Sequence, residues 1–284
     1  MPHTPHTITL PRRPPLVLGR RALVMGILNV TPDSFSDGGR HNRVEAALAH
    51  ARLMLAEGAD IIDIGGESTR PGAEPVGVQE ELDRVMPVID AIRAAGIAAP
   101  VSIDTMKPLV ADQAIQAGAD MVNDVTGLQG APEMAGIAAL HEVPVVAMHW
   151  DRAWTAGTDP IPAMIRWFRA TLAIAGRAGI PPARIVLDPG FGFGKTLQQN
   201  YSILRHLPEL KAAFPDQALL VGTSRKSMIG RLLDNRPDQR LPGTLATTVQ
   251  GYERGGHIFR VHDVAANRDA LRVAEATLYG PPEG

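Results

Sequence analysis

The stretch ALVMGILNV, residues 22–30, is apolar almost throughout and carries one polar residue near its end, Asn29. A strand with one face in water alternates apolar and polar residues, but this stretch has no polar face. It is therefore typical of a parallel strand that is covered on both sides. Stretches of the same character recur along the chain at 60–66, 100–105, 121–126, 143–149, 184–190, 219–224 and 257–263.

Segments with helical spacing lie between these predicted strands. From Val44 to Leu55, apolar residues recur at intervals of four, three and four, and Gly58 follows as a helix terminator. Alternating strands and helices indicate βαβ units. Eight such units predict an α/β protein with a (β/α)8 TIM barrel, and an open doubly wound sheet is the alternative. Further helices are expected at 106–117, 163–178 and 264–277.

The composition limits the possible functions. The chain has 284 residues, 45% of them hydrophobic, and a net charge of -2, so no overall charge attracts it to nucleic acid or to a membrane. The longest apolar stretches are shorter than the ~18 residues of a membrane helix. With no cysteine, disulfides, thiol catalysis and thiolate metal sites are excluded. We expect a cytoplasmic protein with neither nucleic acid nor membrane as a partner.

The barrel is expected to form a single domain. We place it at residues 22–278, because no linker or shift of composition interrupts that range. Residues 1–21 are rich in proline and histidine and lack the apolar segment of a secretory signal. We expect them to form a mobile arm or a short edge strand. Residues 279–284 are expected to be a C-terminal tail.

Polar residues stand at or just beyond the end of every predicted strand. In a barrel these ends converge on one face, where such enzymes have their active sites. A single strand-end Asp could simply cap the next helix, but the same pattern on all the strands favours a common site. The residues are Asn29, Asp63, Glu67, Asp104, Asn123, Asp124, His149, Asp188, Lys226, Arg260, His262 and Asp263.

Two chemical groups can be distinguished within this set. Asp104, Asn123 and Asp188 could line a pocket for a flat heterocycle rich in N–H groups, because carboxylates accept paired bonds from such an edge. The remaining group is cationic and indicates a phosphate or diphosphate on the substrate, since barrels often bind phosphate after strands seven and eight. It consists of Arg70, Lys226, Arg260 and His262.

Other local patterns give weaker signals. PGFGFGKT, residues 189–196, has proline where a Walker A loop requires its first glycine, and its glycine spacing is not that of a Rossmann fingerprint. His262 and Asp263 have no third ligand at metal spacing. We expect Met148, His149 and Trp150 to be wall residues, with His149 a hydrogen-bonded histidine at the end of a strand.

Two long segments follow the first two strands. They are rich in Gly, Pro, Ser and Asp, and they cover residues 31–42 and 67–77. They could be idle surface loops, but their place on the catalytic face favours mobile loops that close over a substrate.

Seven motifs of this chain resemble those of the dihydropteroate synthase family, in order and at similar spacing. The resemblance extends from about residue 23 to residue 278. The motifs are MGILNVTPDSFSDGG, DIIDIGGESTRPGA, SIDTMKP, VNDVTG, LDPGFGFGKT, VGTSRKSMIG and FRVHDV. After the fifth strand, Met148-His149-Trp150 differs from the Met-His-Met of many members, which affects the expected shape of that loop.

The resemblance implies an enzyme of folate biosynthesis, the step that sulfonamides block. Such a transferase condenses 6-hydroxymethyl-7,8-dihydropterin diphosphate with 4-aminobenzoate, giving 7,8-dihydropteroate and diphosphate. It also implies a TIM barrel that is often a homodimer and uses Mg²⁺. We expect the C–O bond to ionise first and the amine to attack the resulting cation.

The resemblance also implies a role for individual residues. Those implied in catalysis are Asp104, Lys226, Arg260 and His262. Those implied in pterin binding are Asp104, Asn123, Met148, Asp188 and Lys226. Those implied in diphosphate binding are Asn29, which would also contact Mg²⁺, Thr69, Arg70, Arg260 and His262. Those implied in 4-aminobenzoate binding are Thr69, Pro71, Phe193 and Ser227. Those implied in the first mobile loop are Asp33, Ser34 and Phe35.

Two other functions remain open at this point. A pterin-binding methyltransferase barrel, which passes a methyl group from a folate to a corrinoid, would share the Asp and Asn pocket. It would have no use for the cations of the SRKS and RVHD segments. A paralogue that binds a pterin without catalysis is the other alternative, but such proteins tend to lose the Asn, Arg, Lys and His set that this chain keeps.

Overall fold

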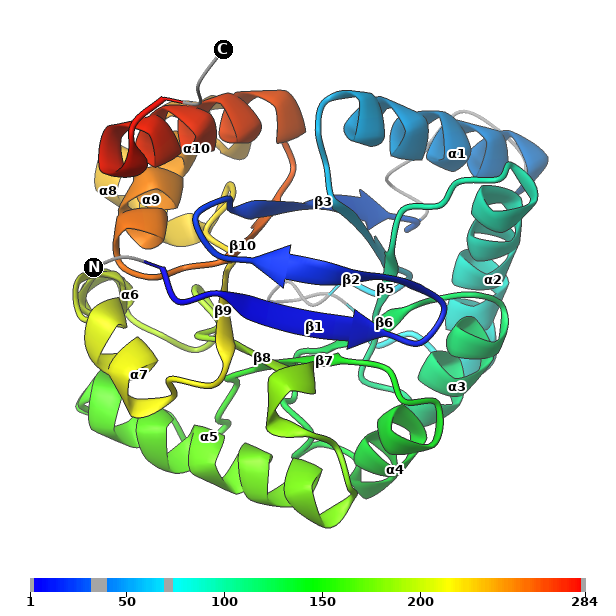
Figure 1. The fold of residues 1–284 in the computed structure, drawn as a ribbon, viewed down its shortest axis with the longest axis horizontal. Coiled ribbons are helices and arrows are strands. Elements are labelled where there is room, and N and C mark those ends of the chain that lie inside the picture. Colours follow the sequence, from blue (N-terminus) through cyan, green and yellow to red (C-terminus); the bar gives the residue numbers. More distant parts are fainter. Residues whose placement is uncertain (1–2, 32–39, 69–73, 282–284) are drawn as a thin grey trace.

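The parallel strands of this protein close into a barrel that helices surround (Figure 1). The computed structural model describes residues 3–31, 40–68 and 74–281. Strand β10 pairs with β3 on one side and with β9 on the other, which closes the sheet. The predicted TIM barrel is therefore confirmed, and the open-sheet alternative is wrong.

The barrel strands are short and almost entirely buried, as their continuous apolar sequences predict. Alternate residues point into the barrel or out against the helices, so both faces are covered. The strands are β3 (Leu23–Asn29), β4 (Ile61–Gly65), β5 (Val101–Asp104), β6 (Met121–Asp124), β7 (Val145–Met148), β8 (Ile185–Asp188), β9 (Ala218–Val221) and β10 (Ile258–Val261).

Proline and glycine residues mark the ends of several helices in the outer layer. Proline begins α3, α4 and α5, where its missing N–H costs nothing, and Gly118 follows α3 with a φ of +119°. The helices are α1 (Arg40–Ala56), α2 (Val78–Ala94), α3 (Pro108–Gln116), α4 (Pro132–Leu140), α5 (Pro160–Arg177), α6 (Leu197–Arg205), α7 (Leu207–Ala213), α8 (Ser227–Leu233), α9 (Leu241–Glu253) and α10 (Val264–Tyr279), with 3-10 turns at Pro182–Arg184 and Pro237–Gln239.

An antiparallel hairpin, β1 (His6–Leu10) and β2 (Arg13–Leu18), crosses the end of the barrel where the strands begin (Figure 1). Its apolar residues pack among the first residues of the barrel strands, and Ile8 and Leu18 are each only 1% exposed. Residues 1–21 were expected to be a mobile arm or a short edge strand. The structure instead gives 6–18 a paired hairpin, because alternate apolar side chains cover the barrel's open end.

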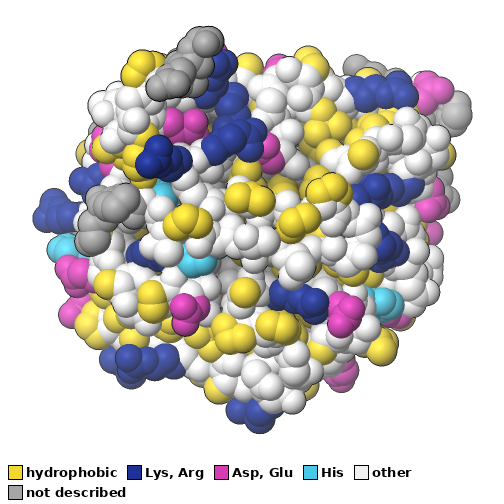
Figure 2. Space-filling view, viewed as in Figure 1, with side chains coloured by type: hydrophobic (Ala, Val, Ile, Leu, Met, Phe, Trp, Pro, Cys, Tyr) yellow, Lys and Arg dark blue, Asp and Glu magenta, His cyan; other side chains and the backbone are white. Residues whose placement is uncertain are grey.

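The outer surface of this hairpin end mixes side chains of all kinds. Figure 2 shows hydrophobic, basic and acidic groups interspersed across it. Among the helices that the structure describes, none has both the length and the apolar character needed to cross a membrane.

Candidate active site

The opposite end of the barrel gathers the predicted polar residues. Asn29, Asp104 and Asp188 are the last residues of β3, β5 and β8. Between the first two lies Gly65 of β4, where a side chain would meet Asp104 at 3.5 Å and the Oδ1 of Asn29 at 3.7 Å. The glycine therefore leaves space in which the amide and the carboxylate approach each other.

A buried network of ion pairs connects four strands. The Nε of Arg260, on β10, donates to the Oδ2 of Asp63 at 2.6 Å, and its Nη2 donates to the Oδ2 of Asp104 at 2.6 Å. The Nδ2 of Asn123 donates to the same oxygen of Asp63 at 3.1 Å. Arg260, which the sequence placed among the cations of the site, lies between two of the acids, because each buried carboxylate requires a partner.

Asp63 is the residue that the predicted binding set omitted. Its side chain is fully buried on β4, and it organises Arg260 and Asn123 together. A carboxylate inside an otherwise apolar strand was a visible signal, since such a charge must be paired when buried. We use the name strand-end cluster for Asn29, Asp63, Asp104, Asn123, Asp188, Lys226 and Arg260.

Burial perturbs the titration of this cluster. Desolvation raises the pKa of Asp104 to about 7, although Arg260 opposes the shift. Desolvation also raises the pKa of Asp188, against the bond donated by the N–H of Gly190 and the charges of Lys226 and Arg260. Burial alone would lower the pKa of Arg260, but Asp63 and Asp104 raise it overall. Acids perturbed in this way are suited to a ligand that brings N–H donors.

Lys226 extends the cluster toward the loop after β8. Its Nζ lies 4.3 Å from the centre of the Phe193 ring, and that ring contacts Trp150 edge-on at 5.2 Å. Gly192 has a φ of +82°, and a side chain there would come within 3.3 Å of the Cδ of Lys226. Gly222 borders both Asp188 and Arg260 in the same way, at 3.9 and 4.0 Å. The lysine thus lies beside both an aromatic wall and the acids.

The turns after β9 and β10 are joined by two side-chain pairs. Arg225 is exposed and forms a bidentate ion pair with Asp263, at 3.0 and 2.5 Å. The Oγ of Ser224 lies 3.0 Å from the Nδ1 of His262. Ser224 therefore contacts His262, whereas Arg225 contacts Asp263.

His149 differs from expectation. It was predicted to be a hydrogen-bonded histidine, but within the described residues neither ring nitrogen has a hydrogen-bond partner. The ring is 1% exposed and lies 4.9 Å, centre to centre, from both Trp154 and Trp167. Burial lowers its pKa to about 3, so the ring is neutral. Aromatic packing has taken the place of the expected hydrogen bond.

Lys195, in the PGFGFGKT segment, has a structural role that the sequence did not reveal. Its Nζ donates to the carbonyl oxygens of His149, Gly190 and Phe193, at 3.2, 2.8 and 3.2 Å. The side chain is only 7% exposed, and burial lowers its pKa to about 7. Its ammonium group therefore binds backbone carbonyl oxygens of the segments after β7 and β8.

Two further predicted residues adjoin members of the strand-end cluster. Ser227 begins α8 directly after Lys226 and is exposed, and Met148 pairs in register with Asp188. Six more lie outside the described residues, so their roles stay predictions. They are Asp33, Ser34, Phe35, Thr69, Arg70 and Pro71.

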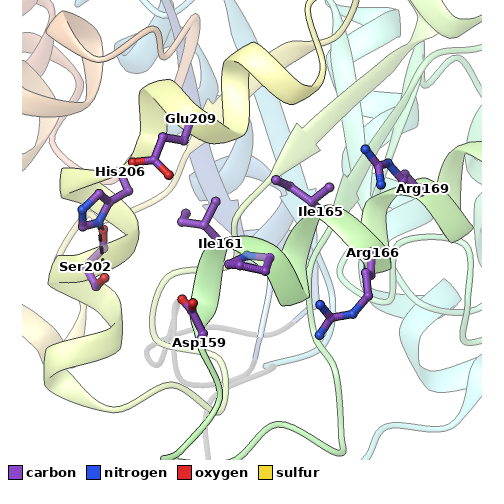
Figure 3. Close-up of a pocket in the computed structure, with 9 residues that line it drawn as sticks. Asp159, Ile161, Ile165, Arg166, Arg169, Ser202, His206 and Glu209 are labelled. Carbon is purple, nitrogen blue, oxygen red and sulfur yellow. Dashed lines mark hydrogen bonds between the residues drawn. The ribbon is translucent and has the colours of Figure 1, made fainter.

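A hollow lies on the outside of the barrel, away from the strand-end cluster. This groove of about 570 Å³ runs between α5 and the pair α6 and α7, and Figure 3 shows Asp159, Arg166, Arg169, His206 and Glu209 around it. None of the residues that line it belongs to the strand-end cluster. Its charges are mixed and most of them are exposed, so we assign it no ligand.

A barrel whose strand ends hold paired acids, an amide and cations fits the class of pterin-binding enzymes, and residues 25–262 match the family described as pterin binding enzyme. A dihydropteroate synthase of Synechocystis sp. is 49% identical to this chain over 266 residues, which is 91% of each protein. The chain belongs to the dihydropteroate synthase family, as its motifs indicated.

Solved structures agree with this assignment. The dihydropteroate synthase of Xanthomonas albilineans with 4-aminobenzoic acid superimposes with a TM-score of 0.90 at 45% identity, covering 98% of this chain and 100% of the other. The same enzyme in complex with 7,8-dihydropteroate gives 0.84 at 44% identity, covering 93% and 97%.

Proposed function

We propose that this protein condenses 6-hydroxymethyl-7,8-dihydropterin diphosphate with 4-aminobenzoate, giving 7,8-dihydropteroate and diphosphate for folate biosynthesis. The observation that carries the proposal is the position of Arg260 in the strand-end cluster, in contact with Asp63 and Asp104. At this position Arg260 would join acids suited to a flat, N–H-rich ring to a cation for its charged substituent. A methyltransferase would need the pocket without such cations.

The acids and the amide support recognition of the pterin. Asp188 and Asp104 would accept N–H groups from the ring, because burial makes an unpaired carboxylate costly at both positions. The Nδ2 of Asn123 donates to Asp63, which presents the carbonyl oxygen of the same amide as an acceptor. Met148 would supply an apolar surface beside Asp188, its partner in the register.

The cations support departure of the diphosphate. As the C–O bond lengthens, negative charge grows on the leaving group, and Arg260, His262 and Arg70 would stabilise it. The two ion pairs of Arg260 use two of its five N–H groups, so it can donate to an anion while Asp63 and Asp104 hold it. Lys226 would bind the pterin beside the Phe193 ring.

The second substrate favours this order of events. An aromatic amine is a weak nucleophile, so a strongly electrophilic pterin cation suits it, and Asp104 and Asp188 would keep negative charge near that cation. We place the 4-aminobenzoate beside Phe193 and Ser227, next to Lys226. Thr69 and Pro71 would contact it as well, and Asp33, Ser34 and Phe35 would belong to a mobile loop over the site.

The donor set is compatible with Mg²⁺. Within the described residues no group of three or more His, Asp or Glu side chains could hold a metal ion. Mg²⁺ bound with a phosphate substrate commonly uses only one or two protein oxygens. Asn29, with its Oδ1 near Asp104 around Gly65, fits that mode. When bound, Mg²⁺ would offset charge on the diphosphate.

We also propose that the protein works in the cytoplasm as a homodimer. Leu232 and Leu233, adjacent on α8, are 58% and 50% exposed, and a second copy of the chain would cover them. Sedimentation of the wild type should give a dimer mass, and Leu232→Glu should shift it toward the monomer. A monomer mass for the wild type would contradict this assembly.

The reaction is tested by mixing the protein with the pterin diphosphate, Mg²⁺ and 4-aminobenzoate and measuring diphosphate release. We expect release that depends on 4-aminobenzoate, and a parallel reaction without the amine is the control. Pterin binding without release would support a non-catalytic paralogue. Methyl transfer from a methylfolate to a corrinoid would support the methyltransferase alternative.

A further inference from the structure

Ser224 contacts His262 at two points. Ser224 follows β9 and is 4% exposed, and His262 follows β10. The Oγ of Ser224 accepts a hydrogen bond from the backbone N–H of His262 at 3.1 Å, and it lies 3.0 Å from the Nδ1 of the same residue. One hydroxyl therefore bridges the backbone and the ring of a single histidine.

The same kind of bridge occurs at His3, where a further contact identifies the tautomer. The hydroxyl of Tyr279 accepts from the backbone N–H of His3 at 2.8 Å and lies 2.6 Å from its Nδ1. The Nε2 of His3 faces the carbonyl oxygen of Tyr252 at 2.9 Å, and a carbonyl can only accept, so Nε2 carries the hydrogen. Burial lowers the pKa of His3, which keeps the ring neutral. Its Nδ1 is then the acceptor and the bridging hydroxyl is the donor.

His262 shares with His3 the hydroxyl bridge that spans the backbone N–H and Nδ1. We propose that Ser224 is a positioning residue, which donates to Nδ1 and so holds His262 in the neutral tautomer with its hydrogen on Nε2. The Nε2–H then donates to an anionic oxygen of the diphosphate, a consequence that rests on the proposed function. His262 thus supplies a donor without first gaining a proton.

The backbone around this pair is held in place. Arg225, next to Ser224, forms its ion pair with Asp263, next to His262. The N–H of Arg225 also donates to the Oγ1 of Thr244 at 3.1 Å. The two turns therefore keep a fixed separation, and the hydroxyl stays within reach of the ring.

The protein contains an internal contrast at another Ser–His pair. In the outer groove, the Oγ of Ser202 lies 3.4 Å from the Nδ1 of His206 (Figure 3). That nitrogen lies 2.9 Å from the carbonyl oxygen of Ser202, so it must be the donor. His206 therefore carries a hydrogen on Nδ1, whereas we assign His262 a hydrogen on Nε2 alone.

The tautomers are measured on the free protein by long-range ¹H–¹⁵N correlation NMR after labelling its histidines. We expect His262 to show a protonated Nε2 and an unprotonated Nδ1 at neutral pH, and His206 to show a protonated Nδ1. The His262→Gln variant assigns the signals. A hydrogen on Nδ1 of His262, or on both of its nitrogens, would overturn the proposal without reference to any activity.

Variants of the serine test the positioning role. In Ser224→Ala we expect the His262 signals to become those of mixed tautomers, and Ser224→Thr should restore the wild-type pattern. Ser202→Ala is the matched control and should leave the His262 signals unchanged. Calorimetry with inorganic diphosphate should show binding roughly fivefold to tenfold weaker for Ser224→Ala, which is the loss of about one neutral hydrogen bond.

Variants of the histidine keep the test independent of how Ser224→Ala folds. Glutamine can place an amide N–H near the Nε2 position, whereas asparagine reaches only the Nδ1 position. His262→Gln should keep diphosphate affinity within about threefold, and His262→Asn should lose about tenfold. Equal loss in both variants would contradict the role of Nε2–H.

The two proposals can fail separately. If the tautomer and the diphosphate affinities behave as expected but no condensation is found, the proposed function is wrong and the positioning role stands. If condensation is found and His262 carries its hydrogen on Nδ1, the positioning role is wrong.

Discussion

Arg260 and Asp63 form a buried ion pair at the end of the barrel, with Nε 2.6 Å from Oδ2, although β3 separates the two strands that carry them. The side chain of Asp63 is inaccessible to solvent, and that of Arg260 is 19% exposed. The guanidinium of Arg260 is therefore partly accessible at the strand-end cluster, while the buried carboxylate of Asp63 holds it in position. Any change at Asp63 should affect substrate binding through Arg260.

The first prediction concerns Asp63→Asn. Removing one partner of a buried ion pair costs about 3 to 5 kcal/mol, although Asp104 still holds Arg260, so we expect the lower end of that range in denaturant unfolding. Because Arg260 loses its fixed direction, kcat/KM should fall at least about tenfold. Asp238→Asn is the control. The Arg236–Asp238 pair is exposed, so its loss should lower the free energy of unfolding by less than about 1 kcal/mol. Equal effects of the two substitutions would contradict the role of Asp63.

The second prediction concerns Lys226→Ala. Its Nζ contacts the Phe193 ring beside the acids, so its removal should weaken binding of the pterin diphosphate about a hundredfold. The fold should stay intact, because the lysine is only partly buried. Arg231→Ala removes an exposed cation from the adjacent helix α8 and should leave the affinity unchanged. Isothermal calorimetry measures both, and unchanged affinity for Lys226→Ala would refute its role.

The barrel could be predicted from sequence because burial on two faces leaves a clear signal, the continuous apolar run. The convergence of Asp104, Asn123 and Asp188 followed from the same signal, since parallel strands of a barrel end on one face. The ion-pair or hydrogen-bond partner of each polar side chain could not be predicted from the sequence. Arg260 pairs with acids from two other strands, and this depends on register and side-chain reach across the barrel. The bond from Ser224 to His262 similarly connects residues that are 38 positions apart.

The third prediction concerns Lys195→Met. Methionine has a similar volume but no donor, so the carbonyl oxygens of His149, Gly190 and Phe193 would lose their shared ammonium. The loop that carries Phe193 should loosen, and the KM for 4-aminobenzoate should rise about tenfold, more than the KM for the pterin substrate. Steady-state kinetics with each substrate varied in turn measures this. A rise that is equal for both substrates would indicate a general loss of structure instead.

The last prediction concerns stability in acid. Burial lowers the pKa of His149 and of His257 to about 3, and both side chains are 1% exposed. A histidine whose pKa is depressed in the folded state contributes stability above its unfolded value near 6.5, and this contribution is lost as the pH falls toward 3. Between pH 6.5 and 4.5, protonation of each histidine in the unfolded chain should lower the free energy of unfolding by on the order of 2 kcal/mol. This is less than two pH units at 1.36 kcal/mol, because the unfolded side chain is already about half protonated at pH 6.5.

His257→Asn isolates this effect, because asparagine cannot be protonated and its amide oxygen can replace Nδ1 as the acceptor for the N–H of Leu219. Urea unfolding at pH 6.5 and 4.5 should show a smaller loss of unfolding free energy in the variant, by on the order of 2 kcal/mol. The raised pKa values of Asp104 and Asp188 act in the opposite direction, since a carboxyl that is favoured neutral in the fold gains stability in acid. Asp104 and Asp188 are present in both the wild type and the variant, so their contributions cancel when the two losses of stability are subtracted. If wild type and variant lose the same stability between the two pH values, His257 is not buried as a neutral ring.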